Sequence, residues 1–273
     1  MPPYRNFPHV NSIRLMHIAH MFAVIGHAIA RYLSKTIDIR CSAPPANPLH
    51  LQEILQPGDV LLVEGNSRVS TAIKYLTQST WSHAALYVGS GPCVQVGAPE
   101  DHCFVEADMV HGVRTSGLER FVALHTRICR PFGLTSQEQQ QIAAYAISQV
   151  GHRYDLSNLL DLARYLLPVP PVPTRWRRRM LSVASGEPTR AICSTLIAKA
   201  FSEIRYPVLP QADEGSMRPD DWRRFLGLAV FIPIDEKLIV PRDFDVSPFF
   251  DIVKPTLVSG FNHRDLEWVA QKQ

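Results

Sequence analysis

Short apolar runs separated by turn residues dominate the first half of the chain and restrict the folds available to it. Turn residues such as Pro57-Gly58-Asp59 precede one run, and Gly89 and Gly91 follow another. Runs of this length, rich in β-branched and aromatic residues, indicate strands. They cover residues 60–63, 83–88, 94–96, 103–107 and 122–129, with a short helix predicted over 70–78. Residues 112–114 either continue the sheet or form a turn in it. Since the connections are short, we expect a largely antiparallel sheet.

The second half has the periodicity and caps of helices. Thr135 and Glu138 form a capping box, which predicts a helix that continues to Gly151. Further helices are predicted over 156–167 and from about Cys193, and residues 229–234 are expected to form a closing strand. A run of strands followed by a run of helices predicts the α+β class, with the sheet packed against helices.

Composition excludes several classes of protein. With 273 residues, 46% of them hydrophobic and 19% charged, the chain is large enough to bury a core. A formal net charge of +3 is too small to indicate nucleic-acid binding, and no nucleic-acid motif is present. The five cysteines are widely and irregularly spaced, which fits neither a disulfide framework nor a zinc site. We therefore expect reduced thiols, and nothing in the sequence requires a metal or organic cofactor.

The pattern of apolar residues near the N-terminus predicts a helix that is too short to span a membrane. Residues 15–30 carry no formally charged side chain, and apolar residues recur there at helical spacing. Three histidines interrupt the segment, and its length falls short of the roughly 20 apolar residues of a membrane span. Three interpretations stay open: an amphipathic helix at a membrane surface or partner, a signal peptide or anchor, and a helix packed on its own domain.

Proline-rich stretches divide the chain. We expect an N-terminal helix within residues 1–40, a proline-rich linker over 41–50, a main domain over 51–234 and a C-terminal tail over 235–273. Residues 168–190 form a proline- and arginine-rich insertion in the main domain. Its basic cluster, Arg175 to Arg179 with Trp176, favours an anionic substrate or lipid surface. A solvated loop is the alternative.

Cys193 and His83 are the strongest candidates for chemistry. Nucleophilic chemistry needs a thiolate, and both a helix N-terminus and an adjacent imidazolium lower the pKa of a cysteine. Helical periodicity starts directly after Cys193, and His83 begins a buried strand 110 positions earlier. A thiol and a histidine in these positions suit a nucleophile and its base. Taken singly, each residue could instead be an ordinary member of the core.

Glu106 is the candidate for a third member of the site. Strand alternation places Phe104 and Glu106 on one face, with Val105 and Ala107 on the other. A carboxylate on a neighbouring strand could accept the second ring N–H of His83 and fix its tautomer. Asp108 and His111 are alternatives for this role, and an exposed strand glutamate is the other interpretation of Glu106.

Five segments in order resemble the permuted branch of the NlpC/P60 superfamily, and more closely its YiiX/YebB-like group of papain-fold cysteine hydrolases. This group is related to the lecithin retinol acyltransferase branch. The segments are Pro57-Gly58-Asp59-Val60-Leu61, Trp81 to Gly89, Val105-Glu106-Ala107 with Gly112-Val113, Gly151-His152-Arg153-Tyr154-Asp155, and Ile192-Cys193-Ser194. In papain the cysteine precedes the histidine, and the reversed order here suits a circular permutation.

The resemblance implies a circularly permuted papain-like fold, to which the N-terminal helix is an addition. It also implies a nucleophile at Cys193, a base at His83 and an orienting residue at Glu106. The expected function is a thiol hydrolase that cleaves an amide or ester, in a cell-wall peptide or a lipid-linked acyl group, through a thioester. An acyltransferase and a non-catalytic membrane-associated binding protein are the alternatives. Contact with a membrane surface through residues 12–33 and Arg175–Arg179 is expected, and a membrane-associated or cell-envelope location is favoured over the soluble cytoplasm.

Overall fold

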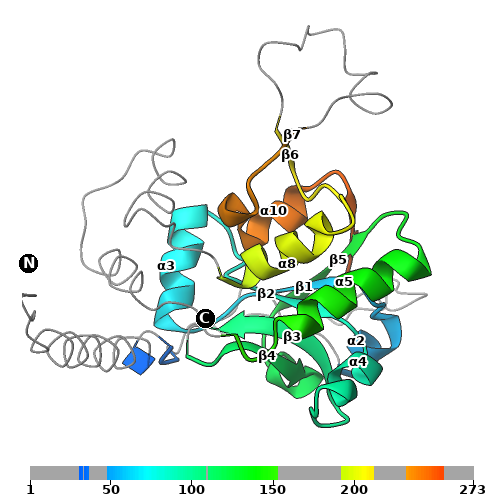
Figure 1. Cartoon of the computed structure of the whole chain (residues 1–273). Helices are drawn as coiled ribbons and strands as arrows, with labels where there is room; N and C mark the ends of the chain where they lie inside the picture. The colour runs from blue at the N-terminus through cyan, green and yellow to red at the C-terminus, as the bar shows by residue number, and fades with distance from the viewer. Residues whose placement is uncertain are drawn as a thin grey trace, which may run out of the picture.

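The computed structural model describes residues 31–32, 34–36, 48–108, 110–152, 192–211 and 232–254 (Figure 1). The predictions for the N-terminal helix over 15–30, the helix over 156–167 and the insertion at 168–190 lie outside the described residues, as does most of the 41–50 linker. Arg153, Tyr154 and Asp155 of the fourth motif also lie outside them. No helix within the described ranges is long and apolar enough to cross a membrane.

A six-stranded antiparallel sheet forms the centre of the described structure. This confirms the predicted α+β class and the antiparallel pairing. The spatial order is β4-β3-β2-β1-β5-β8, so the first four strands neighbour one another in chain order and β5 returns beside β1. The strands are β1 (Val60–Val63), β2 (His83–Tyr87), β3 (His102–Asp108), β4 (Gly112–Gly117), β5 (Thr126–Pro131) and β8 (Phe250–Val253).

Helices and turns pack against both faces of this sheet (Figure 1). The helices of the described part of the chain are α2 (Pro48–Ile54), α3 (Arg68–Thr77), α4 (Ser90–Gln95), η1 (Leu118–Arg120), α5 (Ser136–Ser148), α8 (Ile192–Ser202), η3 (Glu236–Leu238) and α10 (Pro241–Val246). The α5 helix starts at the predicted capping box, in which the Thr135 hydroxyl accepts from the Glu138 N–H. The Glu138 carboxylate in turn accepts from the Thr135 N–H.

Strand alternation divides the core into two clusters. Val105 and Ala107 pack in the larger cluster, with the buried faces of α5 and α8. Phe104 points to the opposite face and packs with Leu51 of α2 and Phe121. The predicted alternation along β3 is therefore confirmed, and it places the α8 helix on one face of the sheet with Glu106 directed to the other.

Two predicted strands have different structures. Residues 90–95 form the α4 helix, although Val94 to Val96 suggested a strand. Cys93 is buried while Val94 and Val96 are about half exposed, so the run contributes one residue to the core rather than alternate residues. The strand predicted over 122–129 begins only at Thr126, because the preceding residues form η1 and the turn that buries Phe121.

The C-terminal part of the described chain completes the sheet. Residues 232–233 of the predicted closing strand form β7 (Ile232–Pro233), which pairs with β6 (Pro210–Gln211) in a separate two-stranded sheet. The sixth strand of the main sheet is instead β8, within the segment expected as a tail, and it pairs with β5. Phe250 explains the difference, because its buried ring makes edge contacts with Phe201 and Phe244 of the larger core cluster.

Candidate active site

His83 lies at the first residue of β2, where several contacts fix the entry of the chain. The Ser82 N–H donates to the Val63 carbonyl, and the Ser82 hydroxyl accepts from the Gly65 N–H. Trp81 is buried, and its indole N–H donates to Asp245 at 3.1 Å. These contacts leave the His83 backbone little freedom, while its side chain is 21% exposed.

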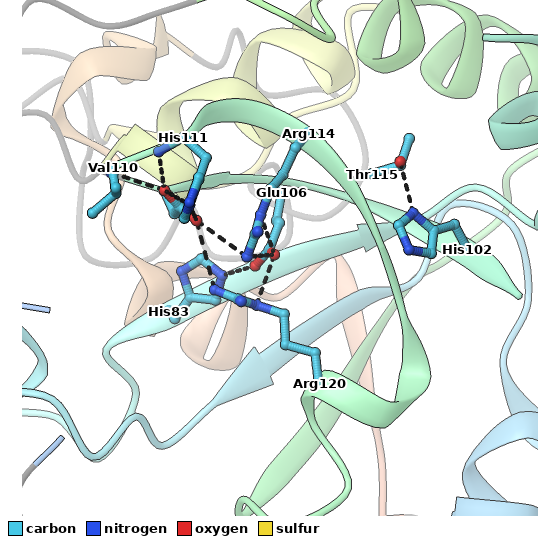
Figure 2. Close-up of polar contacts among 9 residues, drawn as sticks. His83, His102, Glu106, Val110, His111, Arg114, Thr115 and Arg120 are labelled. Carbon is cyan, nitrogen blue, oxygen red and sulfur yellow. Dashed lines mark hydrogen bonds and ion pairs between the residues drawn. The ribbon is translucent and has the colours of Figure 1, made fainter. Parts of the chain in front are cut away.

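Glu106 meets His83 from the next strand. Its Oε2 lies 2.7 Å from the His83 Nε2, and the glutamate is fully buried (Figure 2). Since an ionised carboxylate can only accept, the ring N–H at Nε2 must donate this hydrogen bond. The other ring nitrogen, Nδ1, is then left for a different partner.

Cys193 is that partner. It is the second residue of α8 and is 5% exposed, and its side chain hydrogen-bonds to that of His83. The backbone N–H groups of Ala84 and Ser194 also donate to its sulfur. Together with the helix N-terminus, these donors favour the thiolate over the thiol.

The Ala84 N–H is available because the β2–β3 ladder ends early. The register pairs Leu86 with Val105, and the Val88 N–H donates to the Cys103 carbonyl. Backbone N–H groups of the even-numbered residues of β2 therefore point toward β3. The paired residues stop at Leu86, so the next such N–H, that of Ala84, donates to the Cys193 sulfur instead of a carbonyl.

The described cysteines differ sharply in their acidity. Burial raises the pKa of Cys93 to about 11 and, with nearby negative charges, that of Cys103 to about 12. Burial also raises the pKa of Cys129. Burial opposes ionisation of Cys193 too, but the charge and hydrogen bond of His83 outweigh it, and the pKa of Cys193 is lowered. A pair of oppositely charged groups in contact thus reverses the effect of desolvation.

The partners of Cys193 show the matching shifts. Burial by itself would lower the pKa of His83, but the charge and hydrogen bond of Cys193, followed by those of Glu106, raise it to about 10. Burial by itself would raise the pKa of Glu106, but the contact with His83 and the charges of Arg120 and Arg114 lower it to about 2. At neutral pH these shifts favour a thiolate, an imidazolium and a carboxylate in a row.

Two arginines complete the surroundings of Glu106 (Figure 2). Arg120 Nε lies 2.7 Å and Arg114 Nη2 3.1 Å from its Oε1. Asp108 and His111, the alternatives to Glu106, pair with each other at 3.0 Å. Among the described residues, the carboxylate that contacts His83 is that of Glu106.

The sequence predicted the three residues that the structure brings together, and it missed the arginines. A signal for Arg114 existed, because alternation along the predicted sheet could have placed it opposite Glu106. No local signal identifies Arg120, which reaches Glu106 only because the η1 turn brings the chain back. The described residues contain no group of three or more His, Cys, Asp or Glu side chains that could bind a metal ion.

A thiol at the start of a helix, facing a histidine at the start of an antiparallel strand, is the arrangement of papain-like cysteine hydrolases. Residues 54–165 match the family model described as "permuted papain-like amidase enzyme, YaeF/YiiX, C92 family". Over these residues the chain resembles the permuted papain-like YaeF/YiiX family, and the match supports a cysteine hydrolase of unknown substrate. The matched residues include His83 and Glu106 and end before Cys193.

Other comparisons are more distant. No curated protein matches the chain. Among solved structures, the chain is similar to the crystal structure of metalloprotein yiiX from Escherichia coli O157:H7, with 18% identity and a TM-score of 0.43. That similarity covers 73% of this chain and 96% of the other.

Proposed function

We propose that the chain hydrolyses an amide or ester with Cys193 as nucleophile and His83 as acid and base. The position of His83 carries this proposal, because its ring hydrogen-bonds to Cys193 on one side and to Glu106 on the other. A neutral cysteine is a weak nucleophile, and a preformed thiolate–imidazolium pair removes the need to ionise it during the reaction.

The chemistry follows from the two ring nitrogens of His83. The Cys193 thiolate attacks the carbonyl carbon and forms a carbon–sulfur bond, and the carbonyl oxygen becomes an oxyanion. The backbone N–H of Cys193, at the start of α8, is the candidate donor to that oxyanion. His83 then gives the Nδ1 proton to the leaving nitrogen or oxygen as the carbon–heteroatom bond breaks, which leaves a thioester.

Water completes the cycle. Neutral His83 takes a proton from a water molecule that attacks the thioester carbonyl, the carbon–sulfur bond breaks, and the thiolate–imidazolium pair is restored. Glu106 touches no reacting atom in this scheme, and its role is to hold the Nε2–H of His83. The family description as an amidase favours an amide substrate, such as a cell-wall peptide or an acyl-linked lipid.

Competitive alkylation of the cysteines tests the proposal. Cys103 is the internal control, because it is more exposed than Cys193 but has a raised pKa. With iodoacetamide at pH 6, we expect Cys193 to be labelled at least about tenfold faster than Cys103, since about one pKa unit changes the thiolate fraction tenfold. The His83→Ala variant should lose this preference. Equal and slow labelling of both cysteines in the wild-type protein, measured by mass spectrometry, would rule out the thiolate nucleophile.

Product analysis then separates hydrolysis from acyl transfer. An acyl-electrophile probe should label the wild-type chain and not Cys193→Ala. If the trapped acyl group leaves the enzyme as a free acid in water, the chain is a hydrolase. If it leaves only when an amine or alcohol acceptor is added, the acyltransferase of the same fold is correct.

We also propose contact with a membrane surface, on sequence grounds alone. The apolar stripe within residues 12–33 and the cluster Arg175–Arg179 support it. A chain without residues 1–40 should sediment less with vesicles that contain anionic lipid than the full chain does. Unchanged sedimentation would show that the N-terminal segment does not contribute to membrane binding.

A further inference from the structure

Glu106 is a fully buried carboxylate whose two oxygens have different partners. Oε2 accepts from His83 at 2.7 Å. Oε1 receives Arg120 Nε at 2.7 Å, and Arg114 through Nε at 3.2 Å and Nη2 at 3.1 Å. One oxygen therefore serves the histidine, and the other is occupied by two guanidinium groups (Figure 2).

The two arginines reach Glu106 from different elements. Arg114 lies directly across the β3–β4 ladder from Glu106, so the register itself pairs them. Arg120 ends the η1 turn that follows β4. Both arginines also reach Asp108 Oδ2, at 3.1 Å from Arg114 and 3.7 Å from Arg120. The second carboxylate thereby holds the guanidinium groups over Oε1.

We propose that Arg114 and Arg120 are positioning residues that fix both the rotation and the charge of Glu106, an inference that rests on the function proposed above. The terminal torsion of a glutamate is broad, so one hydrogen bond leaves the carboxylate free to turn. Contacts to Oε1 from two directions prevent that rotation. Oε2 then stays on Nε2, and Nδ1 stays directed at Cys193.

The charge of the arginines matters at one step of the proposed reaction. While His83 is an imidazolium, Glu106 has a cationic partner beside it. Once His83 has given its Nδ1 proton to the leaving group, that charge is gone, and a buried carboxylate without a cation is strongly disfavoured. Arg114 and Arg120 supply the compensating charge at this point. Glu106 then has no need to take the Nε2 proton, and His83 keeps the tautomer that accepts a proton at Nδ1.

Substitution of Arg120 tests the proposal with least risk to folding, because its side chain is 40% exposed. The variants are Arg120→Gln, which removes the charge, and Arg120→Lys, which keeps it. Arg130→Gln is the matched control, since Arg130 also pairs with a buried carboxylate, that of Asp59 at 2.7 Å, but belongs to no part of the site. The rate of Cys193 alkylation at pH 6 and the His83 tautomer, from ring nitrogen-15 shifts, are measured in each.

The expected results separate a positioning role from a structural one. Arg120→Gln should slow Cys193 alkylation about tenfold, the effect of a rise of about one unit in the pKa of the thiol, and should reduce the fraction of Nε2–H tautomer when the ring is neutral. Arg120→Lys should recover most of the alkylation rate and most of the Nε2–H tautomer fraction. Arg130→Gln should change neither the rate nor the tautomer fraction. Wild-type rates and an unchanged tautomer in Arg120→Gln would overturn the proposal. The tautomer is also read in a Cys193→Ala background, so failure of the thiol chemistry leaves this test intact.

Discussion

At the scale of single residues, neighbours rather than burial set the chemistry of the thiols. Cys129 and Cys193 are both buried, yet the pKa of the first is raised and that of the second is lowered. The difference lies in the surroundings of Cys193, where a histidine side chain and two backbone N–H groups contact the sulfur. A search for the most exposed cysteine would therefore choose the wrong residue.

The Glu106→Gln change should lower the fraction of Cys193 that is ionised without moving the Cys193 side chain. The neutral amide removes the negative charge that helps to hold His83 protonated, so the pKa of His83 falls and the thiolate loses part of its counter-charge. We expect the pH profile of Cys193 alkylation to shift upward by about one pH unit. Labelling of Cys103 is the control and should keep its profile. An unshifted Cys193 profile in a folded variant would contradict a role for Glu106.

At the scale of elements, the site depends on where three of them begin or stop. The α8 helix starts beside Cys193, β2 starts at His83, and the β2–β3 ladder stops before Ala84. Two of these boundaries free a backbone N–H from its usual secondary-structure partner, and the Cys193 sulfur accepts from both, those of Ser194 and Ala84. The edge strand β8 contributes differently, since it packs beneath α8 through Phe250.

Phe250 should therefore stabilise the fold far more than its neighbour on the same strand. Its ring is 6% exposed, whereas Ile252 is 37% exposed. We expect Phe250→Ala to lower the free energy of unfolding by about 3–5 kcal/mol, from lost burial and the cavity that remains. Ile252→Ala should cost about 1 kcal/mol or less, as is usual for exposed positions. Urea denaturation measures both, and equal losses would argue against β8 as part of the core.

At the scale of the whole molecule, the buried carboxylate links stability to pH. The pKa of Glu106 is about 2 in the folded protein against 4.5 as its ordinary value. A depressed carboxyl pKa contributes stability that is fully present above the ordinary value and is lost as pH falls through the folded value. The window of this loss therefore extends from about pH 4.5 down to about pH 2.

A comparison of the wild type with Glu106→Gln isolates this contribution. The glutamine cannot titrate, so the stability advantage of the wild type should be constant from pH 5 to pH 6 and should shrink steadily between pH 4.5 and pH 3. The measurement is urea denaturation across this range. A difference that stays constant with pH would show that the carboxyl does not titrate with a depressed pKa.

The sequence by itself determined what depends on neighbouring residues. Local residue spacing predicted the capping box at Thr135, the strand at residues 60–63 and the start of a helix at Cys193. Strand alternation predicted that Phe104 and Glu106 lie on one face of β3. The order of the sequence motifs, with His83 before Cys193, predicted the circularly permuted fold. Local spacing gave the wrong prediction near residues 90–95, which form a helix although Val94 to Val96 suggested a strand. A short apolar run has too few positions to distinguish the period of a strand from that of a helix.

Only the tertiary structure decided the contacts between distant segments. Strand β8 pairs with β5 across more than 100 residues, and no local pattern encodes which strand an edge will accept. Arg120 reaches Glu106 through a turn whose direction depends on the packing of Phe121. The ionisation of Cys193, His83 and Glu106 is decided in the same way, since Coulomb interactions depend on separation in space and on burial, and neither follows from separation along the chain.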